Sequence, residues 1–133
     1  NLEKSIEINQ FRLNLWQKYY ESLEHLQKKQ LIVLPKIPHN CIHNAHMFYI
    51  KVRDLKTRSK LIEHLKQNNI SSVFHYVPLH SSPAGKKFGK FEGIDDFTTS
   101  ESEKIIRLPM YFGLDMDSIR KICEAIEIFF KNS

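Results

Sequence analysis

The opening segment of this chain, residues 2–30, contains no proline or glycine and predicts one long helix. Apolar side chains recur along it at steps of three and four residues, in two neighbouring stripes. The first stripe comprises Leu2, Ile6, Leu13, Trp16, Tyr20 and Leu23, and the second comprises Ile8, Phe11, Leu15 and Tyr19. A helix that covers one face of a small domain needs only one stripe. We therefore expect part of this apolar surface to be exposed in the isolated chain.

Three explanations fit such a wide apolar helix surface. The helix is buried at the centre of the fold, it forms the seam of a homodimer, or it packs on a further part of a longer protein. Asn1 gives the helix no convincing cap, since no chain precedes it, and this favours the last explanation. In that case we expect the stripe bearing Ile8, Phe11 and Leu15 to be the exposed and adhesive one.

After the long helix, proline, glycine and changes of apolar period divide the chain into short segments. The expected order is an extended connector at 31–44, a strand at 46–53, a helix at 55–68, a strand at 70–77, a loop at 79–97, a short helix ending near 106, an extended piece at 107–110 and a final helix. The expected caps are Asp54, Thr98 or Thr99, and Asp115 or Asp117, with Asn68–Asn69 ending the helix at 55–68. In the strand at 46–53, Phe48, Ile50 and Val52 alternate with Met47, Tyr49 and Lys51. The expected core positions of the two later helices are Leu55, Leu61, Ile62, Leu65, Ile119, Ile122, Ile126 and Phe129. This order predicts the α+β class, with a small antiparallel or mixed sheet, helices packed on one face of it, and the long helix in front.

The composition is that of a single soluble globular domain. The 133 residues are 41% hydrophobic and 26% charged. No apolar run approaches the roughly eighteen residues that a membrane-spanning helix needs, so we expect no membrane partner. Cys41 and Cys123 are too few and too far apart for a disulfide framework, which favours a reducing cytoplasm.

The basic character of the chain is modest. The net charge is +5, and the densest basic groups are Lys28–Lys29 and the set of Lys86, Lys87 and Lys90. Neither group is interleaved with aromatic residues as in a nucleic-acid groove, so we expect no nucleic acid in the leading interpretation. These lysines form a solvated surface or, as the alternative, attract an anionic nucleotide-sugar.

A group of potential metal ligands precedes the first strand. His39, Cys41, His43 and His46 are enough for four zinc ligands. Structural zinc ligands usually come as spaced pairs on separate turns, however, and the residues that follow are needed for a strand. We expect no metal site here. The chain also lacks the glycine-rich phosphate loops and the serine hydrolase motifs.

Polar rings gather at the end of the strand at 70–77. His75, Tyr76 and His80 lie in the stretch His-Tyr-Val-Pro-Leu-His, and Pro78 ends the strand. Each ring also has a purely structural explanation. His75 shares a strand face with two valines, and Tyr76 can pack with its hydroxyl bonded to the backbone. His80, in the loop, is the least explained by packing. These three residues are our candidates for binding a polar ligand.

Several stretches of the chain together resemble one enzyme family. They include Asn9–Leu13, Trp16–Tyr20, Asn44–Lys51, Val73–Gly85, Thr98–Glu103 and Arg107–Pro109. A His-Tyr-x-Pro-Leu-His stretch followed by Leu-Pro before a last helix is similar to the nucleotide-sugar aminotransferases of the DegT/DnrJ/EryC1/StrS family. The Ser-Ser-Pro-Ala-Gly continuation resembles a subgroup that makes 4-amino-4,6-dideoxy sugars on dTDP. Asn69 departs from the pattern, since much of the family has glycine there.

The resemblance implies that residues 1–133 are the C-terminal small domain of a fold-type I pyridoxal-phosphate enzyme, with the helix at 2–30 as its linking helix. The N-terminal cofactor domain, with the lysine that holds the cofactor, has no counterpart in this chain, so no catalytic or cofactor-binding residue is expected here. The full enzyme would be a cytoplasmic homodimer that moves an amino group from glutamate to C4 of a dTDP-4-keto-6-deoxyhexose for surface polysaccharide. This chain alone is expected to be inactive. His75, Tyr76 and His80 would contact the substrate, and Asn44 and Arg107 are weaker candidates.

The alternative is a free-standing α/β module that binds a ligand or nucleic acid and has no enzymatic activity. The aminotransferase interpretation predicts a chain that is adhesive or dimeric through its long helix. The module interpretation predicts a monomer whose binding to nucleic acid weakens steeply with salt.

Overall fold

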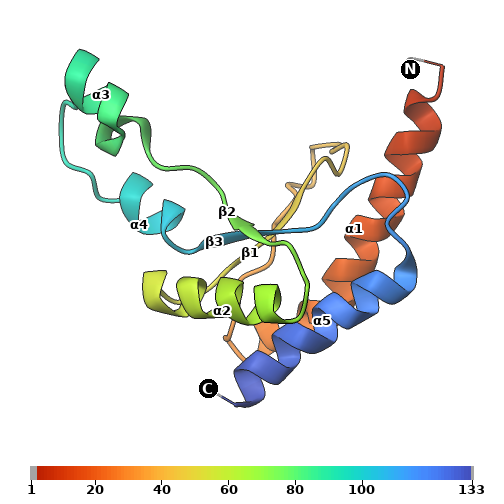
Figure 1. The fold of residues 1–133 in the computed structure, drawn as a ribbon. Coiled ribbons are helices and arrows are strands. Elements are labelled where there is room, and N and C mark those ends of the chain that lie inside the picture. Colours follow the sequence, from red (N-terminus) through yellow and green to blue (C-terminus); the bar gives the residue numbers. More distant parts are fainter. Residues whose placement is uncertain (1–2, 133) are drawn as a thin grey trace.

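The computed structural model describes residues 3–132 (Figure 1). The elements in chain order are α1 (Ser5–Lys28), β1 (Phe48–Lys51), α2 (Leu55–Gln67), β2 (Val73–Phe74), the 3-10 helix η1 (Leu79–Ser81), α3 (Pro83–Phe88), α4 (Thr98–Ser102), β3 (Ile105–Leu108) and α5 (Met116–Lys131). Within this described part, no helix is both long enough and apolar enough to cross a membrane.

The fold is built around a small antiparallel sheet. Its strand order is β1-β3-β2, so the last strand lies between the other two. Phe48 pairs with Leu108 and Val73 with Arg107. Figure 1 shows α1, α2 and α5 together on one side of the strands, while α3 lies at the end of a projecting segment. The predicted α+β class is thereby confirmed.

The core lies between the sheet and the three long helices. The inward residues of β1 and β3 alternate with half-buried ones, as expected for a sheet covered on one face. The fully buried large side chains are Tyr19, Phe48, Leu15, Leu23, Ile50, Leu61, Leu65, Ile106, Ile119 and Ile126.

The inward face of α1 differs from the predicted one. Leu15 and Tyr19 are fully buried, and the ring of Phe11 packs 5.0 Å from that of Phe112. The expectation that the stripe bearing Ile8, Phe11 and Leu15 is the exposed one is therefore wrong. Tyr19 fixes the orientation of the helix, because its hydroxyl donates to the Pro109 carbonyl at 2.9 Å.

The exposed apolar side chain of α1 belongs to the other stripe. Ile6 is 82% exposed, while Trp16 and Leu23 of the same stripe are buried. The inward face thus runs between the two stripes, with the exposed end near the N-terminus. Leu2, which the first stripe also included, lies outside the described residues.

The predicted caps of α2 and α5 are confirmed. Asp54 accepts a hydrogen bond from the Thr57 amide, and Asp115 accepts one from the Ser118 amide, both at 2.7 Å. Past the end of α2, Asn69 takes the left-handed conformation with φ of 59°.

The core positions of α2 and α5 are confirmed with one exception. Leu61 and Leu65 are fully buried, but Leu55 is 42% exposed. Leu61 follows Leu55 by six positions. Since each position turns an α-helix by about 100°, the two side chains point about 120° apart around the helix axis. In α5 the predicted Ile119, Ile122 and Ile126 are buried, and Phe129 is partly buried against the core.

The segment between α2 and β3 corrects three predictions. The strand at 70–77 shortens to Val73–Phe74, an edge strand that pairs only with β3. The loop at 79–97 contains η1 and α3, and α3 starts where the Ser82 hydroxyl accepts from the Gly85 amide at 2.9 Å. Neither Thr98 nor Thr99 caps α4. The cap comes from Asp95, whose carboxylate accepts from the Thr99 amide at 3.2 Å.

Candidate functional site

His75 and Tyr76 follow β2 directly, and their ring centroids lie 4.4 Å apart. His75 is half buried and lines a cavity of about 390 Å³ together with Trp16, His43 and His46. Tyr76 is 65% exposed beside it. The His75 Nδ1 atom is buried without a hydrogen-bond partner among the described residues. An unpaired imidazole nitrogen in a residue that lines a cavity makes His75 a candidate for binding a ligand there.

The electrostatics of this cavity favour a neutral His75. Burial lowers the pKa of His75, and Coulombic interactions with Arg107 and His46 lower it further. At neutral pH the ring is therefore uncharged and offers one donor and one acceptor. Among residues 3–132, no carboxylate side chain lines the cavity, while Lys36 does. The site as a whole suits hydroxyl groups and anions.

Asn44 and Arg107, the weaker candidates, have distinct places near this cavity. The Asn44 side-chain oxygen accepts from the His46 amide at 3.2 Å and lies 3.1 Å from His46 Nδ1. Asn44 thus holds His46 in position. Arg107 sits in β3, opposite Tyr49 of β1 and Val73 of β2, and reaches His75 through its positive charge.

His80 lies in a different cavity, of about 520 Å³, together with Leu79, Phe88 and Phe91. Its Nε2 atom is 2.8 Å from an Asp95 carboxylate oxygen, and the Thr99 hydroxyl donates to the same oxygen. The two Thr99 hydrogen bonds, with a smaller contribution from His80, lower the pKa of Asp95. Asp95 is therefore a carboxylate at neutral pH and accepts a hydrogen bond from Nε2–H of His80.

The structure brings only two of the three candidates together. His75 and Tyr76 are in contact, while His80 lines a cavity that shares no residue with theirs. Trp16 and Tyr49 line the cavity of His75 from other elements, so no local sequence pattern connects them with it. His46 had been considered only as a metal ligand. Across residues 3–132, no group of three or more His, Cys, Asp and Glu side chains is placed to hold a metal ion.

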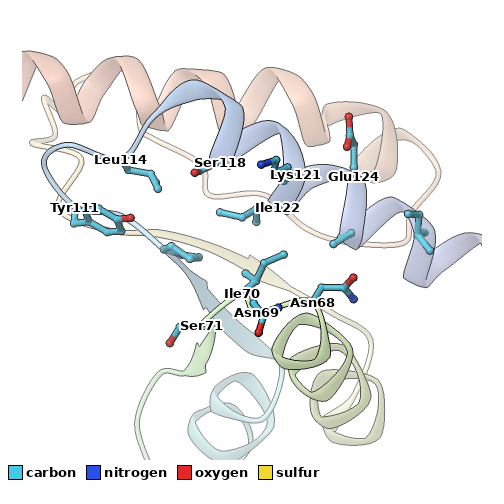
Figure 2. A pocket seen from close by; sticks show the side chains of 13 residues that line it. Asn68, Asn69, Ile70, Ser71, Tyr111, Leu114, Ser118, Lys121, Ile122 and Glu124 are labelled. Carbon is cyan, nitrogen blue, oxygen red and sulfur yellow. The ribbon is translucent and has the colours of Figure 1, made fainter.

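A third cavity, of about 550 Å³, lies between the end of α2 and α5 (Figure 2). Figure 2 shows Asn68, Asn69 and Ile70 on one wall and Leu114 and Ile122 on the other. The Asn68 amide donates to the His64 carbonyl at 2.8 Å, so this polar group is already bonded within the chain. None of the residues predicted to bind the substrate lines this cavity, so it is a weaker candidate for the functional site.

Pyridoxal phosphate has no suitable lysine in the described chain. The lysines are exposed, except for Lys51 and Lys104. Both of these pair with Glu101, at 2.7 and 2.9 Å. A lysine that binds this cofactor needs a free amine in a largely desolvated site. The lysines of the described residues therefore do not fit a Schiff base with this cofactor.

Comparison with known proteins gives the family. The model of the DegT/DnrJ/EryC1/StrS aminotransferase family matches residues 1–127. The chain belongs to this family. An uncharacterised protein of Methanocaldococcus jannaschii is 33% identical over 82% of the chain. The dTDP-3-amino-3,6-dideoxy-alpha-D-galactopyranose transaminase of Aneurinibacillus thermoaerophilus is 26% identical over 81% of it. The chain spans 28% of the length of each of these relatives.

Solved structures give the fold. The aminotransferase TlmJ of Streptoalloteichus hindustanus superposes with a TM-score of 0.85 at 17% identity, over 98% of this chain and 34% of that one. NtdA of Bacillus subtilis, solved with the bound cofactor PMP, has a TM-score of 0.79 at 25% identity, over 93% of this chain and 28% of that one. The chain therefore shares, over nearly all of its length, the fold of a segment of these solved structures.

Proposed function

We propose that this chain is the C-terminal domain of a sugar-nucleotide aminotransferase that uses pyridoxal phosphate. The family match over residues 1–127 is the observation that carries the proposal. The structure of NtdA with bound PMP supports a pyridoxal cofactor for the family member of which this chain is part. That cofactor, when bound, would supply the electron sink for amino-group transfer, and it would be held by another part of the protein.

We propose that His75, Tyr76 and His80 contact the sugar nucleotide. Neutral His75 offers its unpaired Nδ1 to a substrate hydroxyl or phosphate, and Tyr76 presents its hydroxyl from the exposed side. Asp95 holds the ring of His80 through Nε2, which leaves the Nδ1 atom to contact the substrate. In this chain these residues bind and orient the substrate, and none carries out the amino transfer.

The proposed substrate is a dTDP-4-keto-6-deoxyhexose, with glutamate as amino donor and surface polysaccharide as the destination of the sugar. The transaminase of Aneurinibacillus thermoaerophilus supports a dTDP-linked deoxy sugar, although its named product carries the amino group at C3. The Asn-Ala-His-Met-Phe-Tyr and Ser-Ser-Pro-Ala-Gly stretches favour C4 instead. The enzyme would be a cytoplasmic homodimer, and the isolated chain would be inactive.

The test starts from the native gene product in its source cells. We expect an intact mass well above that of this chain, the yellow colour of pyridoxal phosphate and a lysine adduct trapped by borohydride. With glutamate, the protein should aminate dTDP-4-keto-6-deoxyglucose faster than its 3-keto isomer. A native protein of 133 residues without cofactor would refute the proposal and favour a free-standing binding module. A preference for the 3-keto isomer would refute only the position of transfer.

A further inference from the structure

A fourth cavity, of about 620 Å³, lies between the first half of α2 and the last turn of α5. It shares no lining residue with the cavities of His75 and His80. Its volume is in the range of about 300–1,000 Å³ that is usual for small-molecule sites. Two kinds of side chain line it, cations from α2 and the residue before the Asp54 cap, and aromatic rings from α5. The chemistry of a ligand follows from this combination.

The cations of this cavity are close together along the chain. Lys56 and Lys60 are both exposed and lie four positions apart, so they occupy the same side of α2. Like charges at this spacing repel each other and destabilise the helix. Arg53 adds a third positive charge. Its Nε atom donates to the Asp54 carboxylate at 2.8 Å, and a guanidinium has further N–H donors for a ligand.

The two lysines have no counterion in the described chain. Among residues 3–132, no carboxylate side chain lines the cavity, and neither Lys56 nor Lys60 forms an ion pair or a hydrogen bond. An anion in the cavity would therefore neutralise a repulsion that the protein itself leaves uncompensated. A phosphate group suits these cations, because ammonium and guanidinium groups both donate charge-assisted hydrogen bonds to its oxygens.

The aromatic part of the lining is held in place by contacts within the chain. The rings of Phe129 and Phe130 lie 5.1 Å apart, and the ring of His64 lies 5.6 Å from that of Phe129. The His64 Nε2 atom donates to the Ala125 carbonyl at 3.0 Å, which joins α2 to α5. Both phenylalanines are only half buried. Ordered, accessible rings of this kind bind planar ligands by stacking, and such stacking accepts any nucleobase.

We propose that this cavity binds a nucleotide, with the phosphates at Lys56 and Lys60 and the base against Phe130. A lone phosphate would use only the cations, whereas a nucleotide uses both parts of the lining. A nucleic acid needs a basic groove that continues over several nucleotides, while these cations and rings line one cavity. The inference goes beyond the function proposed above and does not rest on it.

Lysine acetylation of the native protein measures occupancy of this cavity directly. The protein is treated with N-hydroxysuccinimidyl acetate with and without ADP, and each lysine is followed by peptide mass spectrometry. We expect ADP at ten times its dissociation constant to slow acetylation of Lys56 and Lys60 by about tenfold. Bound phosphate covers the amines and favours their charged, unreactive form. Lys86 and Lys87, exposed in α3, should react equally in both samples.

Substitutions separate the two parts of the site. Lys60→Gln removes one charge and keeps a good helix former, and it should raise the dissociation constant of ADP by about tenfold. Phe130→Leu keeps an apolar side chain without the ring, so it should weaken binding of ADP but leave binding of inorganic pyrophosphate unchanged. Lys66→Gln is the control, because it removes an exposed charge of the same helix outside the cavity.

Three outcomes would overturn the inference. One is acetylation of Lys56 and Lys60 at the same rate with and without ADP. Another is equal protection by ADP and by pyrophosphate at the same concentration, since the aromatic rings would then contribute nothing. The third is protection by a single-stranded oligonucleotide at a lower nucleotide concentration than ADP requires, which would identify a nucleic acid as the occupant.

Discussion

At the scale of single residues, His75 stands out because its Nδ1 atom is buried and has no partner in the described chain. Leaving a buried polar atom unpaired costs about 1–3 kcal/mol, so such an atom calls for a ligand or an ordered water. His80 is the opposite case, since Asp95 already bonds its Nε2 atom. From the sequence, His80 had been the histidine least explained by packing. In the structure, His75 is instead less explained by packing than His80, because its Nδ1 atom has no partner among the described residues.

The two cysteines should differ sharply in reactivity. Cys41 is exposed, whereas Cys123 is buried in α5, and burial raises the pKa of its thiol to about 12. Because the thiolate is the reactive form, we expect a disulfide reagent at pH 8 to label one thiol quickly and the second only after unfolding. A Cys41→Ser variant should show no fast labelling. Rapid labelling of that variant would mean that α5 does not pack as described.

Gly85 is fixed by a close approach of the backbone. A Cβ atom built at this position would overlap the Leu79 carbonyl oxygen. We expect Gly85→Ala to destabilise the segment of residues 78–99 by about 1–3 kcal/mol. The effect should appear as faster amide exchange in α3, with an unchanged core. Gly93 is the control, because a Cβ there meets no atom within 4 Å and only its φ of 95° is unfavourable. A larger loss for Gly93→Ala would contradict this account.

At the scale of elements, the cap of α2 should make stability depend on pH. Hydrogen bonds from Thr57, assisted by Arg53, lower the pKa of Asp54 from 3.8 to about 2. A folded-state pKa below the unfolded one stabilises the protein above the unfolded pKa. This stabilisation is lost as the pH falls through the folded value. We therefore expect Asp54→Ala to lower the urea midpoint at pH 7 and to have little effect near pH 2.

Asp54→Asn separates the cap from its charge. Asparagine caps helices as well as aspartate does, so this variant should keep most of the urea midpoint at pH 7. Its midpoint should lose the part of the acid dependence that comes from Asp54. If Asp54→Asn and Asp54→Ala behaved alike at pH 7, the side-chain hydrogen bond to the Thr57 amide would not be the stabilising contact.

Elements with local signals were predictable from the sequence, and elements that depend on distant partners were not. Asp54, Asn69 and Asp115 act within a few residues of themselves, and their predicted roles are confirmed. The extent of β2 depends on β3, which is more than thirty positions away and pairs with only two residues of this segment, Val73 and Phe74. The start of α3 was signalled by Ser82 before a proline, and that signal was overlooked.

The candidate site divides in the same way. The His-Tyr-x-Pro-Leu-His stretch drew attention to His75, Tyr76 and His80, whereas the cavity around His75 needs Trp16 of α1 and His46 of the connector. Such an assembly depends on how α1 packs, and α1 carries two apolar stripes that periodicity alone does not rank. The role of Asp95 is not apparent from the sequence, because this residue joins two separate elements. It contacts His80, fifteen positions earlier, and Thr99, four positions later.

At the scale of the whole molecule, the proposed site makes a prediction for the native enzyme. His75→Ala and His80→Ala should each raise KM for the sugar nucleotide by about tenfold or more, because each removes a hydrogen bond to the substrate. Cofactor absorbance should stay unchanged, since neither residue is proposed to contact the cofactor. His39→Ala, on the exposed connector, is the control. Unchanged kinetics in both variants would refute the assignment of the substrate site.

Residues 78–99 project between β2 and β3, and these two strands are neighbours in the sheet. Val73 before this segment pairs with Arg107 after it, so the sheet already holds the two ends of the segment together. The entropy of closing a loop rises only slowly with its length. The segment between these strands can therefore be lengthened, shortened or exchanged at small cost to the core. Exchanging residues 78–99 between two aminotransferases would therefore test whether this segment influences which substrate is accepted.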